Sequence, residues 1–336
     1  MNIIIPMAGW GSRLRPHTLT VPKPMLPVAG KSIVEHLIDN LLPVCPEKVN
    51  NIAFIIREEF GPEIEQELAK IAHKHNVKHS IHYQDQPLGT AHAIACAKEY
   101  LKGNAIIAFA DTVFKADFKI DTSKDGVIWV QKIDDPSSFG VVKLNEQNEI
   151  IDFVEKPKDF VSDLAIIGVY YFKHGENLRA EIEYLIDNDI KEKGEYQLTN
   201  ALENLKQKGA KFIPGQVIEW LDCGNKEATI YSNQRILEFL REKKESLRAN
   251  TCILENSIII EPCYIGEDSI IVNSVVGPHV SIGKGTKIHD ARIANSIIQN
   301  HTSIKNIVIT DSMIGSKVVI DVKANDLSLG DYVSLK

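Results

Sequence analysis

The sequence lacks the features that would place it in a membrane or in an oxidising compartment. Its five cysteines (Cys45, Cys96, Cys223, Cys252, Cys263) are scattered and contain no CxxC pair, which favours free thiols over a disulfide framework. No apolar run approaches the roughly 18 residues that cross a bilayer. No basic stretch followed by a long apolar segment opens the chain, so we expect no signal peptide. These absences predict a cytoplasmic protein without a membrane partner.

Positive charge is also in short supply. Lys and Arg number 38 against 45 Asp and Glu, a formal net charge of −7. A nucleic-acid partner held by bulk electrostatics is therefore not expected, and any site for an anionic ligand must be positive locally. The 336 residues, 44% of them hydrophobic, are enough for a large core and predict two domains.

The two best-known phosphate-binding motifs are missing from the first glycine turn, which lies in PMAGWGSRLRPHTLTVPKPMLP (residues 6–27). A dinucleotide-binding fingerprint needs a third glycine three residues after Gly11, where Leu14 stands, and the GK[ST] of a P-loop is absent. A glycine turn can still present backbone N–H groups to phosphate. It shares a proline-stiffened loop with three cations: Arg13, Arg15 and Lys23.

Two patterns divide the chain. Up to about residue 220, apolar strands such as 52–56 and 105–110 alternate with amphipathic helices, which predicts a parallel sheet with helices on both faces. Between residues 127 and 172 strands dominate, so the sheet is expected to be mixed. We predict an α/β, Rossmann-like domain over residues 1–224 and a connecting helix over 225–248.

After residue 250 apolar residues recur at every fifth or sixth position, with short polar turns between them. A fixed short period indicates a solenoid, whereas a β-sandwich would show alternation of period two. The pattern resembles the hexapeptide repeats of left-handed parallel β-helices and predicts one over 249–336. The inward residues would be Leu254, Ile259, Ile265, Ile271, Val276, Ile282, Ile288, Ile293, Ile298, Ile304, Ile309, Ile314 and Ile320.

The stretch AGWGSRLRPHTLTVPKPMLPVAGKSI resembles the opening motif of sugar-phosphate nucleotidyltransferases, close to G-x-G-T/S-R-L-x-P followed by PKP. These enzymes, which include the glucose-1-phosphate thymidylyltransferases, join a nucleoside triphosphate to a sugar 1-phosphate and release pyrophosphate. The resemblance implies that Arg13 and Lys23 meet the phosphates. The sequence departs from the family pattern at Trp10, where glycine is usual. The resemblance also implies a nucleotide-binding turn made of Ala8, Gly9, Gly11 and Ser12.

Further segments carry the same resemblance. YQDQPLGTAHAI (83–94) matches the base-reading segment and implies four nucleotide-binding residues: Gln84, Pro87, Gly89 and Thr90. Asp111 follows a buried strand, where a carboxylate faces the ligand crevice. Asp222 lies in EWLDCGN, which resembles the family's W-x-D-x-G. Two carboxylates suit Mg²⁺, because that ion takes few protein oxygens and completes its shell with water and phosphate.

The sugar side is implied by FGVVKL (139–144), FVEKP (153–157) and two later segments. The resemblance gives this sugar-binding set: Gly140, Glu155, Lys156, Gly168, Tyr170, Glu195 and Thr199. The nucleophile would be a phosphate oxygen, already an anion, so no general base is needed. Charge neutralisation by Arg13 and Lys23, with Lys156 positioning the nucleophile, would then carry catalysis.

Several alternatives stay open. The motifs favour dTTP or UTP with glucose 1-phosphate, but the opening stretch is also similar to mannose-1-phosphate guanylyltransferases. A non-catalytic regulatory subunit that binds a nucleotide sugar is a different class with the same plan. The β-helix could also transfer an acyl group, although its three histidines (His279, His289 and His301) fall in turns. We expect instead that it serves oligomerisation or regulation in a homo-oligomer.

Overall fold

The computed structural model describes residues 1–323, and the chain divides into two units. The first contains Met1–Leu26 and Ser32–Asn225, and the second contains Pro27–Lys31 together with the chain from Lys226 onward. Residues 324–336, which the sequence assigned to the β-helix, lie outside the described part. The sequence did not predict that the short segment Pro27–Lys31 belongs to the second unit.

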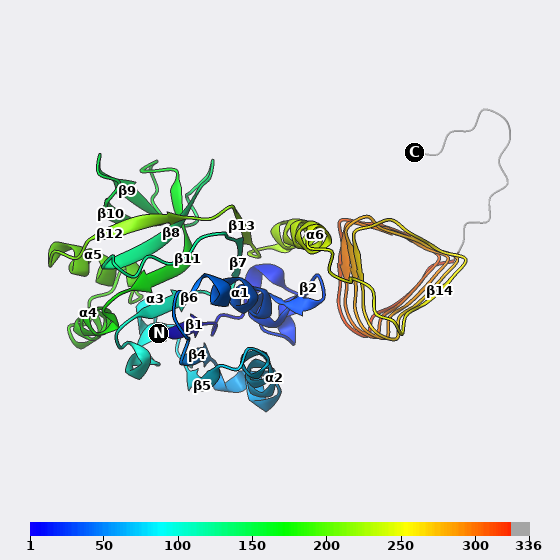
Figure 1. The fold of residues 1–336 in the computed structure, drawn as a ribbon. Coiled ribbons are helices and arrows are strands. Elements are labelled where there is room, and N and C mark those ends of the chain that lie inside the picture. The colour runs from blue at the N-terminus through cyan, green and yellow to red at the C-terminus, as the bar shows by residue number, and fades with distance from the viewer. Residues whose placement is uncertain (324–336) are drawn as a thin grey trace. The chain divides into compact units, whose positions relative to one another are not determined.

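The first unit is built around a mixed sheet, which among residues 1–323 has nine strands (Figure 1). Its order is β10-β9-β11-β6-β1-β4-β5, with β8 paired to β11 and β12 to β8. The strands β6, β1, β4 and β5 are parallel, whereas β11 runs antiparallel to β6. The predicted Rossmann-like class is confirmed. The strands are β1 (Asn2–Pro6), β4 (Asn51–Ile56), β5 (Lys78–Tyr83), β6 (Ala105–Ala108), β8 (Gly126–Lys132), β9 (Gly140–Leu144), β10 (Ile150–Glu155), β11 (Leu164–Phe172) and β12 (Phe212–Gln216).

Helices cover both faces of this sheet (Figure 1). The alternation of side chains along β1 sends Ile3 and Ile5 into one core cluster and Ile4 into the other. The first cluster includes residues of α1 and α2, and the second includes residues of α3, α4 and α5. Because β6, β1, β4 and β5 run parallel, their carboxyl ends lie at one edge of the sheet, where the loops that follow them can form a ligand site. The helices are α1 (Ile33–Leu41), α2 (Gly61–Lys74), α3 (Thr90–Ala95), α4 (Gly175–Asp187) and α5 (Leu198–Gln207).

A small two-stranded sheet brings together two distant parts of the sequence. In it β13 (Glu219–Asp222) pairs antiparallel with β7 (Thr112–Lys115), so that Asp222 lies opposite Thr112. The backbone N–H of Cys223 also donates to the carbonyl oxygen of Asp111 at 3.2 Å. The chain therefore carries Asp111 and Asp222 on neighbouring strand ends, although 110 residues separate them in the sequence.

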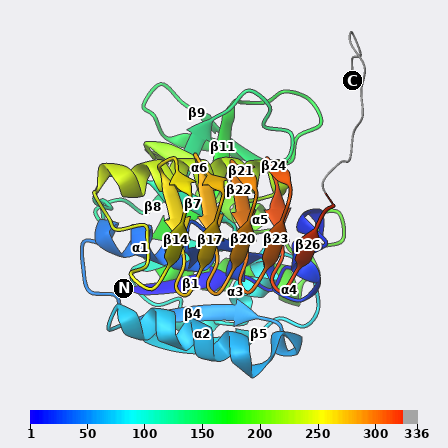
Figure 2. The same ribbon diagram turned by 90° about the vertical axis from the view of Figure 1, so that its right-hand side faces the viewer.

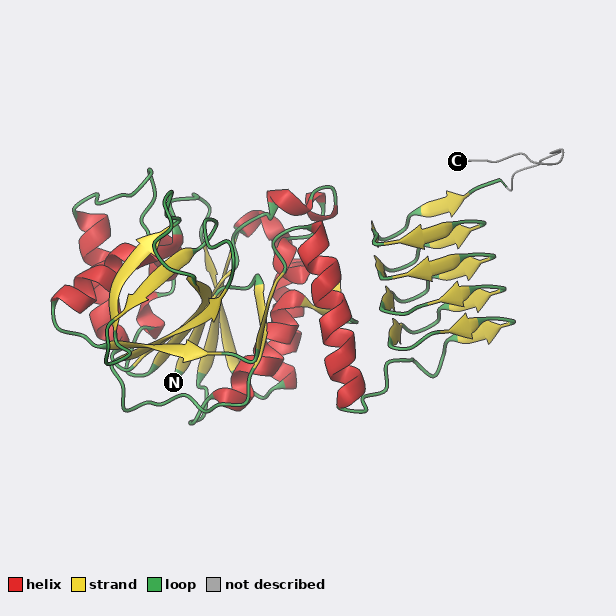
Figure 3. Ribbon diagram, turned by 90° about the horizontal axis from the view of Figure 1, so that it is seen from above, coloured by secondary structure: helices red, strands yellow, loops and turns green. Residues whose placement is uncertain are grey.

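The second unit contains α6 (Lys226–Glu242) and a parallel β-helix. Short strands stack into three parallel sheets, seen face-on and from above (Figures 2 and 3). The predicted inward residues form its core, with Ile271, Ile288 and Ile304 fully buried at equivalent positions in successive coils. Within residues 1–323 no helix is long and apolar enough to cross a bilayer. The strands are β14 (Ile253–Glu255), β15 (Ile258–Ile259), β16 (Cys263–Ile265), β17 (Ile270–Val272), β18 (Val275–Val276), β19 (Val280–Ile282), β20 (Lys287–His289), β21 (Arg292–Ala294), β22 (Ser296–Ile298), β23 (Ser303–Lys305), β24 (Val308–Thr310), β25 (Met313–Ile314) and β26 (Val319–Asp321).

A buried amide ties the hairpin of β2 (Pro27–Val28) and β3 (Lys31–Ser32) to α6 and the β-helix. The Asn233 Oδ1 atom accepts from the Ala29 N–H at 2.9 Å and from the Ser281 hydroxyl at 2.6 Å. Asn233 Nδ2 donates to the His279 carbonyl at 3.3 Å. The fully buried Asn233 thus has partners for both ends of its amide. The chain that has just passed Lys23 is therefore built into the second unit.

Candidate functional site

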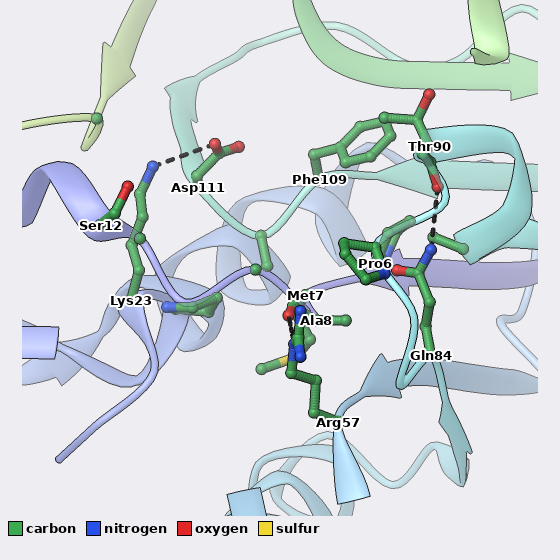
Figure 4. Close-up of a pocket in the computed structure, with 18 of the residues that line it drawn as sticks. Pro6, Met7, Ala8, Ser12, Lys23, Arg57, Gln84, Thr90, Phe109 and Asp111 are labelled. Carbon is green, nitrogen blue, oxygen red and sulfur yellow. Dashed lines mark hydrogen bonds and ion pairs between the residues drawn. The ribbon is translucent and has the colours of Figure 1, made fainter. Parts of the chain in front are cut away.

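A cavity of about 430 Å³ lies where β1, β4, β5 and β6 end (Figure 4). This is the edge at which parallel sheets bind ligands, and the volume is within the usual range for small-molecule sites. Every residue of the predicted nucleotide-binding set lines it, and so do Arg13, Lys23 and Asp111. The members of that set are Ala8, Gly9, Gly11, Ser12, Gln84, Pro87, Gly89 and Thr90.

A second cavity of about 200 Å³ shares three lining residues with the first: Thr90, Phe109 and Asp111. Six residues of the predicted sugar set line it, namely Gly140, Glu155, Lys156, Gly168, Tyr170 and Thr199. The seventh, Glu195, lines the first cavity instead. Asp222 lines the second cavity, so the two predicted metal ligands lie near the place where the cavities meet.

The glycine turn is shaped by its contact with Lys23. Gly11 has φ 75°, a conformation that glycine adopts without strain, and a Cβ there would lie 2.6 Å from the Lys23 Cβ. The Gly11 carbonyl also accepts from the Thr18 hydroxyl at 2.9 Å. Lys23 occupies a short 3-10 turn, Lys23–Met25, and only 6% of its surface is exposed. The prolines on either side thus hold a buried cation against the turn, whereas Arg15 lines neither cavity.

Charges of both signs converge at the junction of the cavities. Lys23 Nζ lies 3.1 Å from Asp111 Oδ2 (Figure 4). Burial raises the pKa of Asp222, as does the nearby Asp111 carboxylate, while Lys23 and Arg13 act in the lowering direction. The four groups therefore form one electrostatic cluster. Within residues 1–323 no group of three or more His, Cys, Asp or Glu side chains is arranged to hold a metal ion, so a metal here would depend on these two carboxylates and on ligand oxygens.

Trp10, which departs from the family pattern, anchors the turn from outside. Its indole Nε1 donates to Glu59 Oε1 at 3.2 Å, and its ring packs edge-on against Phe60 with centroids 5.1 Å apart. The same Glu59 oxygen accepts from Arg57 Nη1 at 3.0 Å, and Arg57 Nε donates to the Ala8 carbonyl at 2.8 Å. A closed set of contacts thus joins both sides of the turn to the end of β4.

Arg57 is a lining residue that sequence reasoning missed. The guanidinium lies beside Ala8 in the cavity (Figure 4). The signal was available, because Arg57 directly follows the buried strand β4, at the same sheet edge as Asp111. Arg57 was not predicted as a site residue because two acidic residues follow it directly in REEF.

Gln84 lies at the far end of the first cavity from Asp111 (Figure 4). Its backbone N–H extends the sheet by donating to the Ile56 carbonyl at 2.8 Å. Its side-chain Nε2 lies 3.0 Å from the Gly89 carbonyl and 3.1 Å from His92 Nδ1. Gly89 has φ 106°, and a Cβ there would meet the Tyr196 carbonyl at 2.5 Å, so only glycine fits this close approach.

The second cavity is walled by polar groups that have room for a ligand's hydroxyls. Glu155 has its side chain 16% exposed, and Lys156 Nζ lies 3.6 Å from Glu155 Oε1. Burial raises the pKa of Tyr170 well above its ordinary value, helped by Glu155 and Asp111. Two further atoms, Thr199 Oγ1 and Trp220 Nε1, are buried without a hydrogen-bond partner in the described part of the chain. Buried polar atoms are rarely left so unless a ligand or water meets them.

Comparison with known proteins agrees with this geometry. A family model described as Nucleotidyl transferase matches residues 2–238. The protein named "Bifunctional protein GlmU" of Methanococcus vannielii is 30% identical over 94% of this chain and 78% of its own length. The "Glucose-1-phosphate thymidylyltransferase" of Streptomyces antibioticus is 29% identical over 95% of this chain and 93% of its own.

A solved structure shares the fold over about two thirds of this chain. It is described as a putative glucose-1-phosphate thymidylyltransferase from Bacillus anthracis in complex with a sucrose, with a TM-score of 0.60 and 23% identity over 69% of this chain and 94% of that one. The two cavities and the family match together define the class of protein. The chain belongs to the nucleotidyl transferase family and is a sugar-phosphate nucleotidyltransferase.

Proposed function

We propose that this enzyme joins a nucleoside triphosphate, dTTP or UTP, to glucose 1-phosphate and releases pyrophosphate. The nucleotide occupies the 430 Å³ cavity and the sugar phosphate the 200 Å³ cavity. The observation that carries the proposal is that the two cavities meet at Asp111, beside the buried Lys23. Two anionic substrates can approach each other only where fixed charge compensates their repulsion.

In the reaction a phosphate oxygen of the sugar 1-phosphate forms a bond to the α-phosphorus of the triphosphate. The bond from that phosphorus to the bridging oxygen of the β-phosphate breaks, and pyrophosphate leaves with the electron pair. Arg13 and Lys23 bind the triphosphate and compensate the charge of the leaving pyrophosphate. Lys156 orients the attacking phosphate. The nucleophile is already an anion, so the side chains position and neutralise rather than move a proton.

The two aspartates fit a divalent cation. Burial raises the pKa of the half-buried Asp222, and the negative charge of Asp111 acts in the same direction. Both would offer carboxylate oxygens to Mg²⁺, leaving its other positions to phosphate and water. When bound there, the ion supplies charge neutralisation at the α-phosphate. Lys23, which pairs with Asp111, would keep that carboxylate turned toward the junction of the cavities.

Sugar recognition falls to the walls of the second cavity. Glu155 accepts hydrogen bonds from sugar hydroxyls, and Gly140 leaves room for its carboxylate, because a Cβ there would meet Glu155 Oε2 at 3.1 Å. The unmatched Trp220 Nε1 offers a donor and Thr199 Oγ1 offers both a donor and an acceptor. A hydroxyl-rich ring satisfies both kinds of atom.

The test is pyrophosphate release from four triphosphates, each with glucose, mannose, N-acetylglucosamine or galactose 1-phosphate, with and without Mg²⁺. We expect the highest kcat/KM with a pyrimidine triphosphate and glucose 1-phosphate. GTP with mannose 1-phosphate as the best pair would instead identify a guanylyltransferase. Binding of a nucleotide sugar without any turnover would favour the regulatory class, and no release in any combination contradicts the proposal.

The aspartates have their own test. Asp222→Asn should lower kcat by about 100-fold or more if the carboxylate carries charge at the reacting phosphate. Burial raises the folded-state pKa, so the ionised carboxylate is disfavoured in the folded protein at neutral pH, and that cost disappears as the pH falls through the raised pKa. In the absence of Mg²⁺ the Tm of Asp222→Asn should therefore equal or exceed that of the wild type at neutral pH. Wild-type turnover by this variant would remove Asp222 from the site.

The assembly is part of the same proposal. We expect a homo-oligomer in which the β-helix supports association, because apolar side chains remain exposed on its coils, among them Ile258, Val308 and Val319. Light scattering of the full chain, compared with a variant that places charges at these positions, measures this. An unchanged mass would exclude these side chains from the interface.

A further inference from the structure

We infer that His92 sets the base preference of the nucleotide cavity: it holds the Gln84 amide with its oxygen toward the cavity, which favours bases with a ring N–H, meaning uracil, thymine or guanine. The inference rests on the proposed function, since it takes the 430 Å³ cavity to be the nucleotide site. His92 is a positioning residue in this scheme, because it contacts Gln84 and does not itself line the cavity.

The amide of Gln84 has one orientation that satisfies its neighbours. Two acceptors face the same end of it, the Gly89 carbonyl at 3.0 Å and His92 Nδ1 at 3.1 Å. The nitrogen donates to both, whereas the reverse orientation would set oxygen against the Gly89 carbonyl oxygen. Figure 4 shows the result: the Gln84 nitrogen points to the side of Thr90, where the Gly89 carbonyl accepts its hydrogen bond, and the oxygen lies on the side of Pro6. Only 8% of Gln84 is exposed, so the side chain has little freedom to turn.

His92 can accept this bond only when it is neutral with its proton on Nε2. Burial lowers the pKa of His92, and no charged neighbour opposes that direction. The ring is stacked on Tyr196, with centroids 6.5 Å apart and an angle of 23°. The other titratable groups near it are Cys96, whose thiol donates to the His92 carbonyl, Asp85, whose charge acts on Cys96, and Glu195, which lines the cavity.

The Gln84 Oε1 atom is then left as a hydrogen-bond acceptor toward the cavity. Within residues 1–323 the Oε1 atom accepts no hydrogen bond. The amide nitrogen, by contrast, has two acceptors, the Gly89 carbonyl and His92 Nδ1. Uracil and thymine offer N3–H and guanine offers N1–H to such an acceptor. Cytosine and adenine present a lone pair at the corresponding ring nitrogen. A nearly buried acceptor that meets a lone pair costs affinity, because neither atom then has a donor.

Protonation of His92 gives the mechanism a distinctive signature. The imidazolium would direct an Nδ1–H at the amide nitrogen, so that two donors face each other and one of the two contacts that orient Gln84 is lost. Discrimination between the two kinds of base should therefore narrow as the pH falls below the ordinary histidine value of about 6.5. A side chain with a purely structural role would change affinity for all bases alike.

The experiment measures binding of UTP, dTTP, GTP, CTP and ATP to the full chain by calorimetry, in Mg²⁺ and without a sugar phosphate, between pH 5.5 and 8. We expect the best of UTP, dTTP and GTP to bind about 10- to 100-fold more tightly than CTP and ATP at pH 7.5, since leaving a buried polar group unmatched costs about that much. The ratio should become smaller as the pH is lowered toward 5.5. His92→Phe keeps a ring on Tyr196 but loses the acceptor, and its ratio should be lower at pH 7.5 and independent of pH.

His73→Phe is the matched control, because His73 is exposed on α2 and lines neither cavity. It should keep the wild-type ratio and its pH dependence. Equal binding of all five triphosphates, or an unchanged ratio in His92→Phe with a wild-type Tm, overturns the inference while the proposed function stands. The expected preference without pyrophosphate release in any combination overturns the proposed turnover alone, and absence of triphosphate binding overturns both.

Discussion

The ammonium of Lys23 lies 3.1 Å from the carboxylate of Asp111, at the point where two cavities of the first unit meet. The two ends of this pair differ: the Lys23 side chain is 8% exposed and that of Asp111 is 47% exposed. The lysine is thus fixed by the glycine turn and the prolines, while the aspartate can reach ligands in either cavity. The cation that would meet phosphate is in place before any substrate binds.

Replacing the Lys23 cation should lower catalysis without disturbing the packing of the fold. Lys23→Met keeps the packing of the stem against Gly11 but removes the charge, so kcat/KM for pyrophosphate release should fall by about 100- to 1,000-fold. Lys48→Met, at an exposed position outside both cavities, is the control and should not change activity. A Lys23→Met enzyme within threefold of the wild type would show that Lys23 does not compensate phosphate charge.

Gly11→Ala tests the closeness of the turn to Lys23. The new methyl group would suffer both from φ 75° and from the Lys23 Cβ at 2.6 Å. We expect a loss of about 1–2 kcal/mol from the left-handed conformation alone, with a further cost from the contact. Gly103→Ala isolates the first effect, because Gly103 has φ 55° with nothing within 4 Å of the added Cβ. Denaturant unfolding should show the larger loss for Gly11→Ala, and equal losses would mean that the contact is harmless.

Trp10→Gly restores the residue usual in the family and should loosen the turn. The indole contacts with Glu59 and Phe60 vanish, so a more mobile turn must be ordered when the triphosphate binds. We expect the KM for the triphosphate to rise about threefold to tenfold, with the KM for the sugar phosphate unchanged. Trp10→Phe, which keeps the ring contact and loses the hydrogen bond, should lie between. Equal increases in both KM values would point to a general loss of structure.

Asn233→Ala should weaken triphosphate binding although Asn233 lies far from Lys23 in the sequence. It leaves the Ala29 N–H and the Ser281 hydroxyl without their shared acceptor in a buried place, which costs about 1–3 kcal/mol for each unsatisfied group. The hairpin that it releases follows Lys23 by only a few residues, so triphosphate affinity should fall together with the Tm. Gln234→Ala, the next position on α6, is the comparison. A variant with lowered Tm and wild-type triphosphate affinity would show that the hairpin does not hold the Lys23 loop.

The sequence by itself determined the fold class and the family. The alternation of strands and helices fixed the first, since each buried face must repeat with the period of its element. The five- or six-residue step after residue 250 indicated the β-helix, because only a solenoid buries an apolar residue at so short and regular a spacing. The glycine turn with its prolines was specific enough to indicate the family, which the comparisons confirmed. The roles of the individual site residues stay predictions, although the structure brings nearly all of them to two adjoining cavities.

Tertiary structure decided what depends on contacts between distant residues. Arg57 enters the nucleotide cavity because β4 ends beside β1, and Glu195 lies in that cavity rather than with the sugar set. The indole of Trp10 acquires its function from Glu59, 49 positions away. The orientation of the Gln84 amide depends on the Gly89 carbonyl and the His92 imidazole. The sequence shows that these residues are present but not where their acceptor atoms point. Spacing along the chain indicates which side chains share a surface, whereas the direction of a hydrogen bond follows only from where the packed backbone places its donors and acceptors.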